Sequence, residues 1–123
     1  MLNKILADFE KAVKRLEEVL ELKKRGVVRD SAIKRFELCF DLAWKSIKNY
    51  SKIQGVECYS PRECFKAAFQ LKLIEHDEEW LLMIDDRNLT THLYKESEAE
   101  NIYEKLPKYL EMFKNLLEKL KSA

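Results

Sequence analysis

The sequence has 123 residues, of which 46% are hydrophobic and 37% are charged, and it contains only two glycines and two prolines. This length predicts one domain over residues 1–123, and so few turn-forming residues exclude an all-β fold and favour long helices. The formal net charge of +1 excludes a field over the whole protein that would attract nucleic acid, so any phosphate-binding groove must be local.

The first helix is predicted over residues 3–25. Its apolar residues recur three and four positions apart, and charged residues fill the other positions. These apolar residues are Ile5, Phe9, Ala12, Val13, Leu16, Val19 and Leu20. Gly26 follows three cations at 23–25, which is typical of a helix C-terminus, where cations meet the negative end of the dipole.

The second helix is expected to begin after a cap at Asp30 or Ser31 and to stop before Gly55, at about Ile53. Its main apolar stripe consists of Ile33, Phe36, Phe40, Ala43, Trp44, Ile47 and Tyr50. Further apolar positions lie beside that stripe, at Leu38, Cys39 and Leu42. A narrow polar stripe consists of Lys34, Glu37, Asp41, Lys45 and Lys48. A helix with so wide an apolar surface usually has two neighbours, and the second is either another helix of the same core or another subunit.

A short third helix is predicted to follow a loop at residues 54–60. Ser60 serves as its N-cap, Pro61 occupies the first helical position and Glu63 completes a capping box. The residues expected to face inward or to close this segment are Phe65, Ala68, Phe69, Leu71, Leu73 and Ile74.

Two more helices complete the chain. Asp77 is expected to cap the fourth, which runs from Glu78 to about Thr91 and buries Trp80, Leu81 and Ile84. A second capping box at 97–100 is expected to start the fifth, in which Pro107 predicts a kink or a short break. The chain therefore predicts an all-α fold, an antiparallel up-and-down bundle of about five helices with one short helix laid across the long ones.

The cysteines and the apolar runs predict a cytoplasmic protein without a membrane span. Cys39, Cys58 and Cys64 contain no CxxC pair and only two histidines accompany them, so we expect no metal site and no cofactor. Cys39 lies among apolar residues and is expected in the core or an interface, and the set fits a reducing cytosol. Polar residues within the first ten positions argue against a signal peptide, and no apolar run approaches about twenty residues.

The stretch at residues 84–94 carries the most chemistry. Arg87, Asn88, His92 and Tyr94 place a guanidinium, an amide, an imidazole and a phenol within eight residues. An arginine fork suits phosphate oxygens, and a histidine can take up and return a proton near neutral pH. In a regular helix, however, five residues at about 100° each would place Arg87 and His92 about 140° apart. Either the helix loosens before His92, or a working site combines groups from two subunits.

The same residues also have purely structural interpretations. Arg87 would then pair with carboxylates such as Asp86 or Glu79, and His92 would satisfy carbonyl groups at a helix C-terminus. Tyr94 would be an amphipathic residue at a helix boundary.

The pattern Arg-polar-x-x-x-His-x-Tyr resembles the signature of the HEPN family, the higher eukaryote and prokaryote nucleotide-binding domains. Two upstream segments are similar to the subgroup described as nucleotidyltransferase substrate-binding proteins. They are Arg-Phe-Glu-Leu-Cys-Phe-Asp-Leu-Ala-Trp-Lys at 35–45 and Ser-Pro-Arg-Glu at 60–63. The resemblance covers about residues 2–120.

The resemblance implies a HEPN-type bundle with a four-helix core that forms a homodimer and partners a cognate minimal nucleotidyltransferase in a two-gene toxin–antitoxin-like system. It makes Arg87 and His92 the catalytic pair of a metal-independent ribonuclease at a dimer cleft, with Asn88 positioning the substrate. It also makes Tyr94 the residue to which the transferase attaches AMP. One alternative is a non-catalytic subunit that presents a substrate or nucleotide to the transferase, and another is a helical dimer without a site.

Four cations are candidates for a groove that binds phosphates of RNA or of a nucleotide. They are Arg35, Lys45, Lys48 and Arg62. Surface lysines on helices are usually only solvated, which is the alternative interpretation of this set. The aromatic residues mostly occupy predicted core positions and do not form a base-stacking platform.

Overall fold

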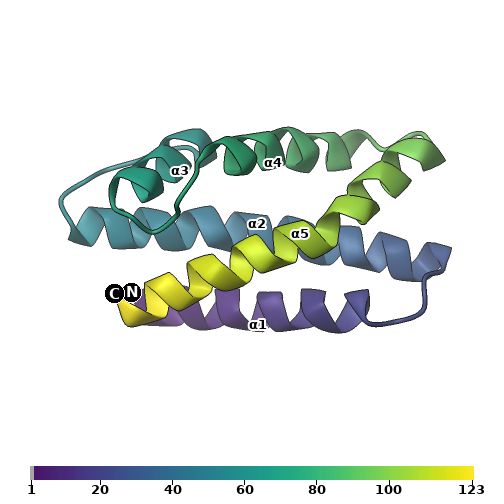
Figure 1. Ribbon diagram of the computed structural model, residues 1–123, viewed down its shortest axis with the longest axis horizontal. Coiled ribbons are helices and arrows are strands. Elements are labelled where there is room, and N and C mark those ends of the chain that lie inside the picture. The colour runs from purple at the N-terminus through teal and green to yellow at the C-terminus, as the bar shows by residue number, and fades with distance from the viewer. Residues whose placement is uncertain (1) are drawn as a thin grey trace.

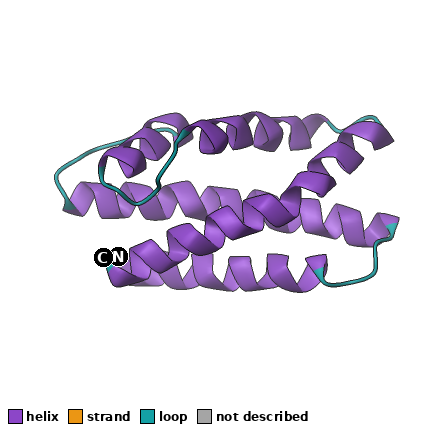
Figure 2. Ribbon diagram, in the orientation of Figure 1, coloured by secondary structure: helices purple, strands orange, loops and turns teal. Residues whose placement is uncertain are grey.

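In the computed structural model, the apolar faces of five helices meet in one hydrophobic core. The structure describes residues 2–123, and for Leu2 and Asn3 it describes the backbone only. Met1, the first residue of the expected domain, lies outside the described residues. The elements are α1 (Leu2–Leu20), α2 (Gly26–Ile53), α3 (Pro61–Gln70), α4 (Glu78–Leu89), the 3₁₀ turn η1 (Thr90–His92) and α5 (Glu96–Ser122). Residues 2–123 contain no strand (Figure 2). The predicted all-α bundle is confirmed.

The second helix is the centre of the bundle. Figure 1 shows α1 running antiparallel to α2, α5 lying across both, and α3 and α4 following α2 along its other side. α2 contacts α1, α3 and α5, so its wide apolar surface finds its neighbours within the same core. The N- and C-terminal ends of the chain lie side by side at one end of the bundle, where Lys121 Nζ of α5 lies 2.9 Å from Glu10 Oε2 of α1.

Aromatic side chains fill the middle of the core. Phe36 of α2 stacks on Tyr109 of α5, with ring centroids 5.4 Å apart, and Phe113 of α5 meets Phe9 of α1 edge to face at 6.1 Å. Phe9 and Phe36 are fully buried, as the predicted stripes require, and Phe113 is fully buried as well. Removing such a side chain costs about 3–5 kcal/mol, so this cluster fixes how the three long helices pack. Phe69 is an exception, because 46% of it is exposed instead of facing inward.

The junction between α1 and α2 differs from the prediction. α1 ends at Leu20, and Gly26 begins α2 instead of ending α1. The inward period stops at Leu20, since Leu22 is 57% exposed, and the five residues 21–25 turn the chain. Buried Val28 then extends the apolar face of α2 by one turn upstream of the expected caps. Packing against the core therefore determines where α2 begins, and the capping residues do not.

The later helix starts agree with the prediction only in part. Ser60 Oγ accepts the Glu63 N–H at 3.2 Å, which confirms the N-cap of α3. Asp77 precedes α4 as expected, but its side chain makes no capping hydrogen bond. α5 begins at Glu96 without a side-chain cap, one residue before the predicted box. Pro107 lies inside an unbroken α5, so the predicted break is absent, and the helix bends along its length in Figure 1.

A disulfide joins the loop before α3 to the helix itself. The three cysteines were expected to fit a reducing cytosol, where thiols stay free, but Cys58 and Cys64 are bonded, with Cα atoms 5.1 Å apart. The turn into α3 brings the two together across six positions, a closeness that the spacing alone does not reveal. Cys39 is a free thiol buried in the core, as expected. None of the helices within residues 2–123 has the length and hydropathy needed to cross a membrane.

Candidate functional site

The motif lies where α4 changes into a tighter turn. α4 ends at Leu89, and Thr90–His92 form the 3₁₀ turn η1. The two threonine hydroxyls bond back to carbonyl oxygens three residues earlier, Thr90 to Arg87 at 2.6 Å and Thr91 to Asn88 at 2.9 Å. Such side-chain bonds compete with the regular helical pattern and favour a tighter turn. The helix thus departs from regular geometry before His92, but it tightens where one of the two alternatives expected it to loosen.

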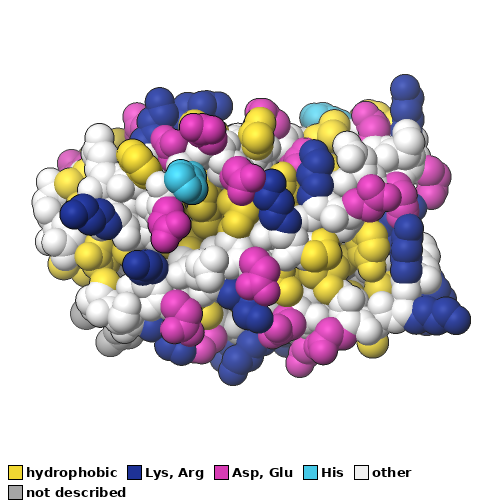
Figure 3. Space-filling view, in the orientation of Figure 1, with side chains coloured by type: hydrophobic (Ala, Val, Ile, Leu, Met, Phe, Trp, Pro, Cys, Tyr) yellow, Lys and Arg dark blue, Asp and Glu magenta, His cyan; other side chains and the backbone are white. Residues whose placement is uncertain are grey.

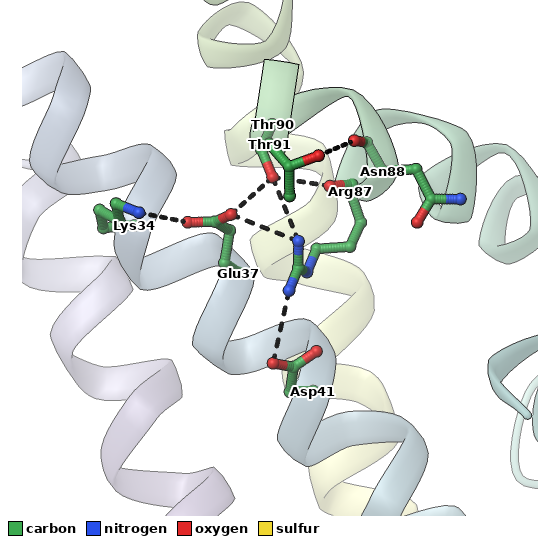
Figure 4. A network of polar contacts seen from close by, with 7 residues as sticks. All are labelled: Lys34, Glu37, Asp41, Arg87, Asn88, Thr90 and Thr91. Carbon is green, nitrogen blue, oxygen red and sulfur yellow. Dashed lines mark hydrogen bonds and ion pairs between the residues drawn. The ribbon is translucent and has the colours of Figure 1, made fainter. Parts of the chain in front are cut away.

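The guanidinium of Arg87 points to α2. Its Nη1 lies 3.3 Å from Glu37 Oε2, and its Nη2 lies 3.6 Å from Asp41 Oδ2 (Figure 4). The Arg87 side chain is 21% exposed, so part of the fork faces solvent. Arg87 therefore has carboxylate partners, as the structural interpretation expected, but they come from α2 and not from Asp86 or Glu79.

The carboxylate of Glu37 connects three groups. Its Oε2 accepts the Thr90 hydroxyl at 2.7 Å as well as Arg87, and its Oε1 lies 3.4 Å from Lys34 Nζ (Figure 4). Only 14% of the Glu37 side chain is exposed. Glu37, Asp41 and Thr90 are site residues that the motif did not single out. The signal for Glu37 and Asp41 was their spacing of four positions in the narrow polar stripe of α2, which suits a cation from another helix.

His92 and Tyr94 face solvent together. Their ring centroids are 6.4 Å apart, and the rings are tilted by 34°. Tyr94 is 86% exposed, and His92 is exposed as well. His92 forms no hydrogen bond or ion pair with Arg87 within residues 4–123. The side chain of Asn88 points away from the Glu37–Arg87 contacts in Figure 4.

Asp86 fixes the opposite side of the same helical turn. Its carboxylate lies 3.2 Å from Lys105 Nζ and accepts a hydrogen bond from the Tyr109 hydroxyl, both on α5. Burial, followed by this hydrogen bond, raises the pKa of Tyr109 well above its usual range. Adjacent residues Asp86 and Arg87 therefore tie α4 to α5 and to α2, respectively.

Three of the four cations proposed for a phosphate groove lie on α2, and Arg62 lies at the start of α3. Arg35 donates to the Arg15 carbonyl of α1 at 2.7 Å, and the Lys48 ammonium lies 5.5 Å from the centre of the Tyr59 ring. Lys45 and Arg62 are exposed. Within the described residues, no three His, Cys, Asp or Glu side chains lie close enough to hold a metal ion.

A separate pocket of about 590 Å³ lies between the start of α4 and the end of α5. Trp80 and Leu116 form part of its apolar lining, and Glu75, Glu118 and Lys119 are among its charged residues. Figure 3 shows hydrophobic side chains in a hollow on this face, with charges of both signs interspersed around it. The pocket contains none of the predicted site residues.

The comparison with known proteins covers the site and nearly the whole chain around it. Residues 4–122 match the family described as nucleotidyltransferase substrate binding protein like. The chain belongs to this family. The predicted nucleotidyltransferase substrate-binding subgroup is thereby confirmed, and the likenesses given next agree with the predicted HEPN resemblance.

Relatives of this nucleotidyltransferase substrate-binding protein come from three bacteria. The probable ribonuclease HepT of Haemophilus influenzae is 26% identical over 105 residues, which cover 78% of this chain and 72% of that protein. A crystal structure from Thermus thermophilus matches with a TM-score of 0.85 at 36% identity, over 91% of this chain and 98% of that one. A tri-AMPylated Shewanella oneidensis HEPN toxin in complex with MNT antitoxin matches with a TM-score of 0.80 at 20% identity, over 99% and 97%. At that identity, the third likeness concerns the fold alone.

Proposed function

We propose that this protein is the helical subunit of a two-component toxin–antitoxin system and a metal-independent ribonuclease that uses Arg87 and His92. The observation that carries the proposal is the motif at the end of α4, where carboxylates hold Arg87 in place and His92 is open to solvent. The Haemophilus relative, a probable ribonuclease, and the Shewanella toxin, solved with its MNT antitoxin, support the same assignment. The proposed partner is a cognate minimal nucleotidyltransferase in the cytoplasm.

The chemistry needs a proton acceptor and a fixed positive charge. His92, as a neutral imidazole, takes the proton of an RNA 2′-hydroxyl, and that oxygen attacks the adjacent phosphorus. The bond from phosphorus to the 5′-oxygen breaks, this oxygen takes up a proton from water, and His92 returns its proton to solvent. The Arg87 guanidinium stabilises the charge that builds on the phosphate oxygens. Asn88 is proposed to position the substrate.

A homodimer would bring an Arg87 and a His92 side chain to the same phosphate. Arg87 faces α2 while His92 faces solvent, so neither can serve one phosphate with the other unless a second chain contributes. The tighter η1 turn does not help, because about 120° of rotation per residue does not return His92 to the face of Arg87. In a two-fold dimer, His92 of one protomer would approach the Arg87 of its partner. Leu38 of α2, next to Glu37, is 50% exposed and offers an apolar contact for such an interface.

Cleavage of a defined RNA by the purified protein tests the proposal. Wild type should cleave in the presence of a chelator, and His92→Ala should not. His76→Ala is the matched control, because His76 is the only other histidine and lies in the connection before α4. Equal loss of cleavage in both variants would contradict the assignment of His92. A wild-type protein that leaves every tested RNA intact would refute the ribonuclease.

A second candidate function is a non-catalytic subunit that binds a substrate or nucleotide for the transferase. The pairing of Arg87 with two carboxylates, without contact to His92, favours this function within one chain. It predicts that a nucleotide binds to the wild-type chain, that Arg87→Lys weakens this binding, and that RNA stays intact. Calorimetric titration with AMP and ATP would measure it.

A further inference from the structure

Glu37 is the point at which α2 meets both halves of the motif. A single oxygen, Oε2, accepts from Arg87 in the last turn of α4 and from Thr90, the first residue of the turn that carries His92. The Thr90 contact is 2.7 Å and the Arg87 contact is 3.3 Å. At 14% exposure, Glu37 is mostly withdrawn from solvent, which strengthens these contacts relative to a surface pair.

Asp41 forms the weaker ion pair with Arg87. It lies 3.6 Å from Arg87 Nη2, is 39% exposed and makes no hydrogen bond to the η1 turn within the described residues. The Nε of Arg87 is buried and has no hydrogen-bond partner among those residues. The orientation of the guanidinium therefore depends on its Nη atoms, and mainly on Glu37.

Thr90 connects Glu37 to the η1 turn that contains His92. Its hydroxyl has one proton and faces two acceptors, the Arg87 carbonyl at 2.6 Å and Glu37 at 2.7 Å. Arg87 Nη1 lies 3.4 Å from the same hydroxyl and donates to it. Glu37, Arg87 and Thr90 thus form a closed set of contacts, in which a shift of Glu37 changes both the arginine and the start of η1.

We propose that Glu37 is a positioning residue that couples the orientation of Arg87 to the conformation of the turn carrying His92. Glu37 need not touch a substrate, because it acts through these two groups. The catalytic part of this inference rests on the ribonuclease proposed above, but the coupling itself is a property of the folded chain.

Two substitutions separate the parts of the coupling, and a third is a control. Glu37→Gln keeps the size of the side chain and one oxygen that can accept from Thr90, but it removes the charge that orients Arg87. Thr90→Val keeps the shape and removes the hydroxyl. Glu17→Gln is the matched control, because it also removes a glutamate charge from an ion pair between two helices. Glu17 Oε2 of α1 lies 2.9 Å from Lys114 Nζ of α5.

The coupling is measured without reference to activity. The chain has two histidines, so a ring NMR spectrum shows one signal from His92 and one from His76, which serves as an internal reference. We expect Glu37→Gln and Thr90→Val to move the His92 signal and leave the His76 signal in place. Amide hydrogen exchange in residues 90–92 should become roughly tenfold faster, as the loss of one anchoring contact implies. Glu17→Gln should change neither. An unchanged His92 signal and unchanged exchange in both variants would overturn the coupling.

Cleavage kinetics then test the consequence for the reaction. Displacement of catalytic groups by about 1 Å can reduce rates on the order of a hundredfold. We therefore expect Glu37→Gln to lower kcat by about ten- to a hundredfold with KM within about threefold of wild type, while Glu17→Gln matches wild type. Unchanged kcat in Glu37→Gln would overturn the positioning role. If wild type cleaves no RNA, the ribonuclease proposal fails, and the NMR result alone decides whether Glu37 couples the two groups.

Discussion

The Glu37 carboxylate of α2 and the Arg87 guanidinium of α4 form an ion pair at 3.3 Å, although 50 positions separate them in the chain. This pair means that the arginine of the motif is a structural residue as well as a candidate for chemistry. Within the described residues, His92, five positions later, makes no side-chain hydrogen bond or ion pair, and it is open to solvent. The two halves of the motif should therefore respond differently to substitution.

Arg87→Ala should lower stability, whereas His92→Ala should not. Removal of the guanidinium leaves Glu37 and Asp41 without their shared cation, and Glu37 is only 14% exposed. Because the site is partly solvated, we expect a loss of about 1–2 kcal/mol for Arg87→Ala, which lowers Tm by roughly 4–8 °C. His92→Ala should stay within about 0.5 kcal/mol of wild type. Thermal melts followed by circular dichroism measure both, and equal Tm values would contradict the ion pairs.

The cysteines should show a definite order of reactivity. Burial raises the pKa of the Cys39 thiol to about 12, and the other two cysteines are bonded to each other. The folded, oxidised protein should therefore release no colour with a thiol reagent at pH 8, one thiol per chain after denaturation and three after reduction. Reduction of this short loop should cost about 2 kcal/mol of stability. Cys58→Ser together with Cys64→Ser should reproduce that loss without reductant. Three thiols that react after denaturation without reductant would contradict the disulfide.

Acid should loosen the start of α5. The hydrogen bond from Arg29, followed by the charge of the same residue, lowers the pKa of Glu96 below its ordinary value of 4.5. A carboxylate with a lowered folded-state pKa adds stability above the unfolded value, and this contribution disappears as the pH falls through the folded value. Tm should therefore fall below about pH 4.5 more steeply in wild type than in Glu96→Gln. Because Glu96 is exposed, 1 M salt should reduce the difference. Parallel pH profiles for the two proteins would show that this pair adds nothing.

Periodicity predicted the helices well because each one has a face that packs. The inward positions of α1, such as Phe9 and Leu16, are fully buried as predicted. Boundaries were predicted less well, because tertiary contacts compete with capping signals. Gly26 and its preceding cations are typical of a helix end, yet the burial of Val28 makes the same glycine a helix start.

The candidate site shows a similar division. Local spacing identified Arg87, Asn88, His92 and Tyr94 together, because all four lie within one short segment. It could not identify Glu37 as the partner of Arg87, since that contact depends on how α4 lies along α2. Three-dimensional closeness of this kind is absent from a single sequence, and the same is true of the Cys58–Cys64 bond.

Self-association should depend on the surface of α2 beside the motif. Of the three surplus apolar positions of α2, Cys39 is in the core, Leu42 is partly buried and Leu38 is 50% exposed. We expect light scattering at micromolar concentration to give twice the chain mass of 14.7 kDa. Leu38→Glu should shift the protein toward monomer, whereas Ile53→Glu, at a 66% exposed position near the end of the same helix, should not. A wild-type protein that scatters only as a 14.7 kDa species would end the dimer proposal.

Tyr94 meets the physical requirements of a residue modified by a second enzyme. It is 86% exposed, directly after the η1 turn, and its ring lies beside that of His92, with centroids 6.4 Å apart. In the modification, the Tyr94 phenol oxygen attacks the α-phosphorus of ATP. A bond from that oxygen to phosphorus forms, pyrophosphate leaves and the phenol proton passes to solvent or to a base. The attached phosphodiester carries a negative charge, which the partly open fork of Arg87 can bind in place of RNA.

We therefore expect the cognate nucleotidyltransferase, given ATP and Mg²⁺, to attach AMP to Tyr94 and to suppress RNA cleavage. Intact-mass spectrometry of the co-expressed pair should show the added mass, and peptide mapping should place it on Tyr94. Tyr94→Phe should cleave RNA like wild type and escape the inhibition, because it lacks only the hydroxyl. Tyr59→Phe is the matched control, since Tyr59 is also exposed, at 66%, but lies before α3 and away from the motif. AMP on Tyr59 or Tyr103, or a Tyr94→Phe protein that the transferase still silences, would contradict this mode of control.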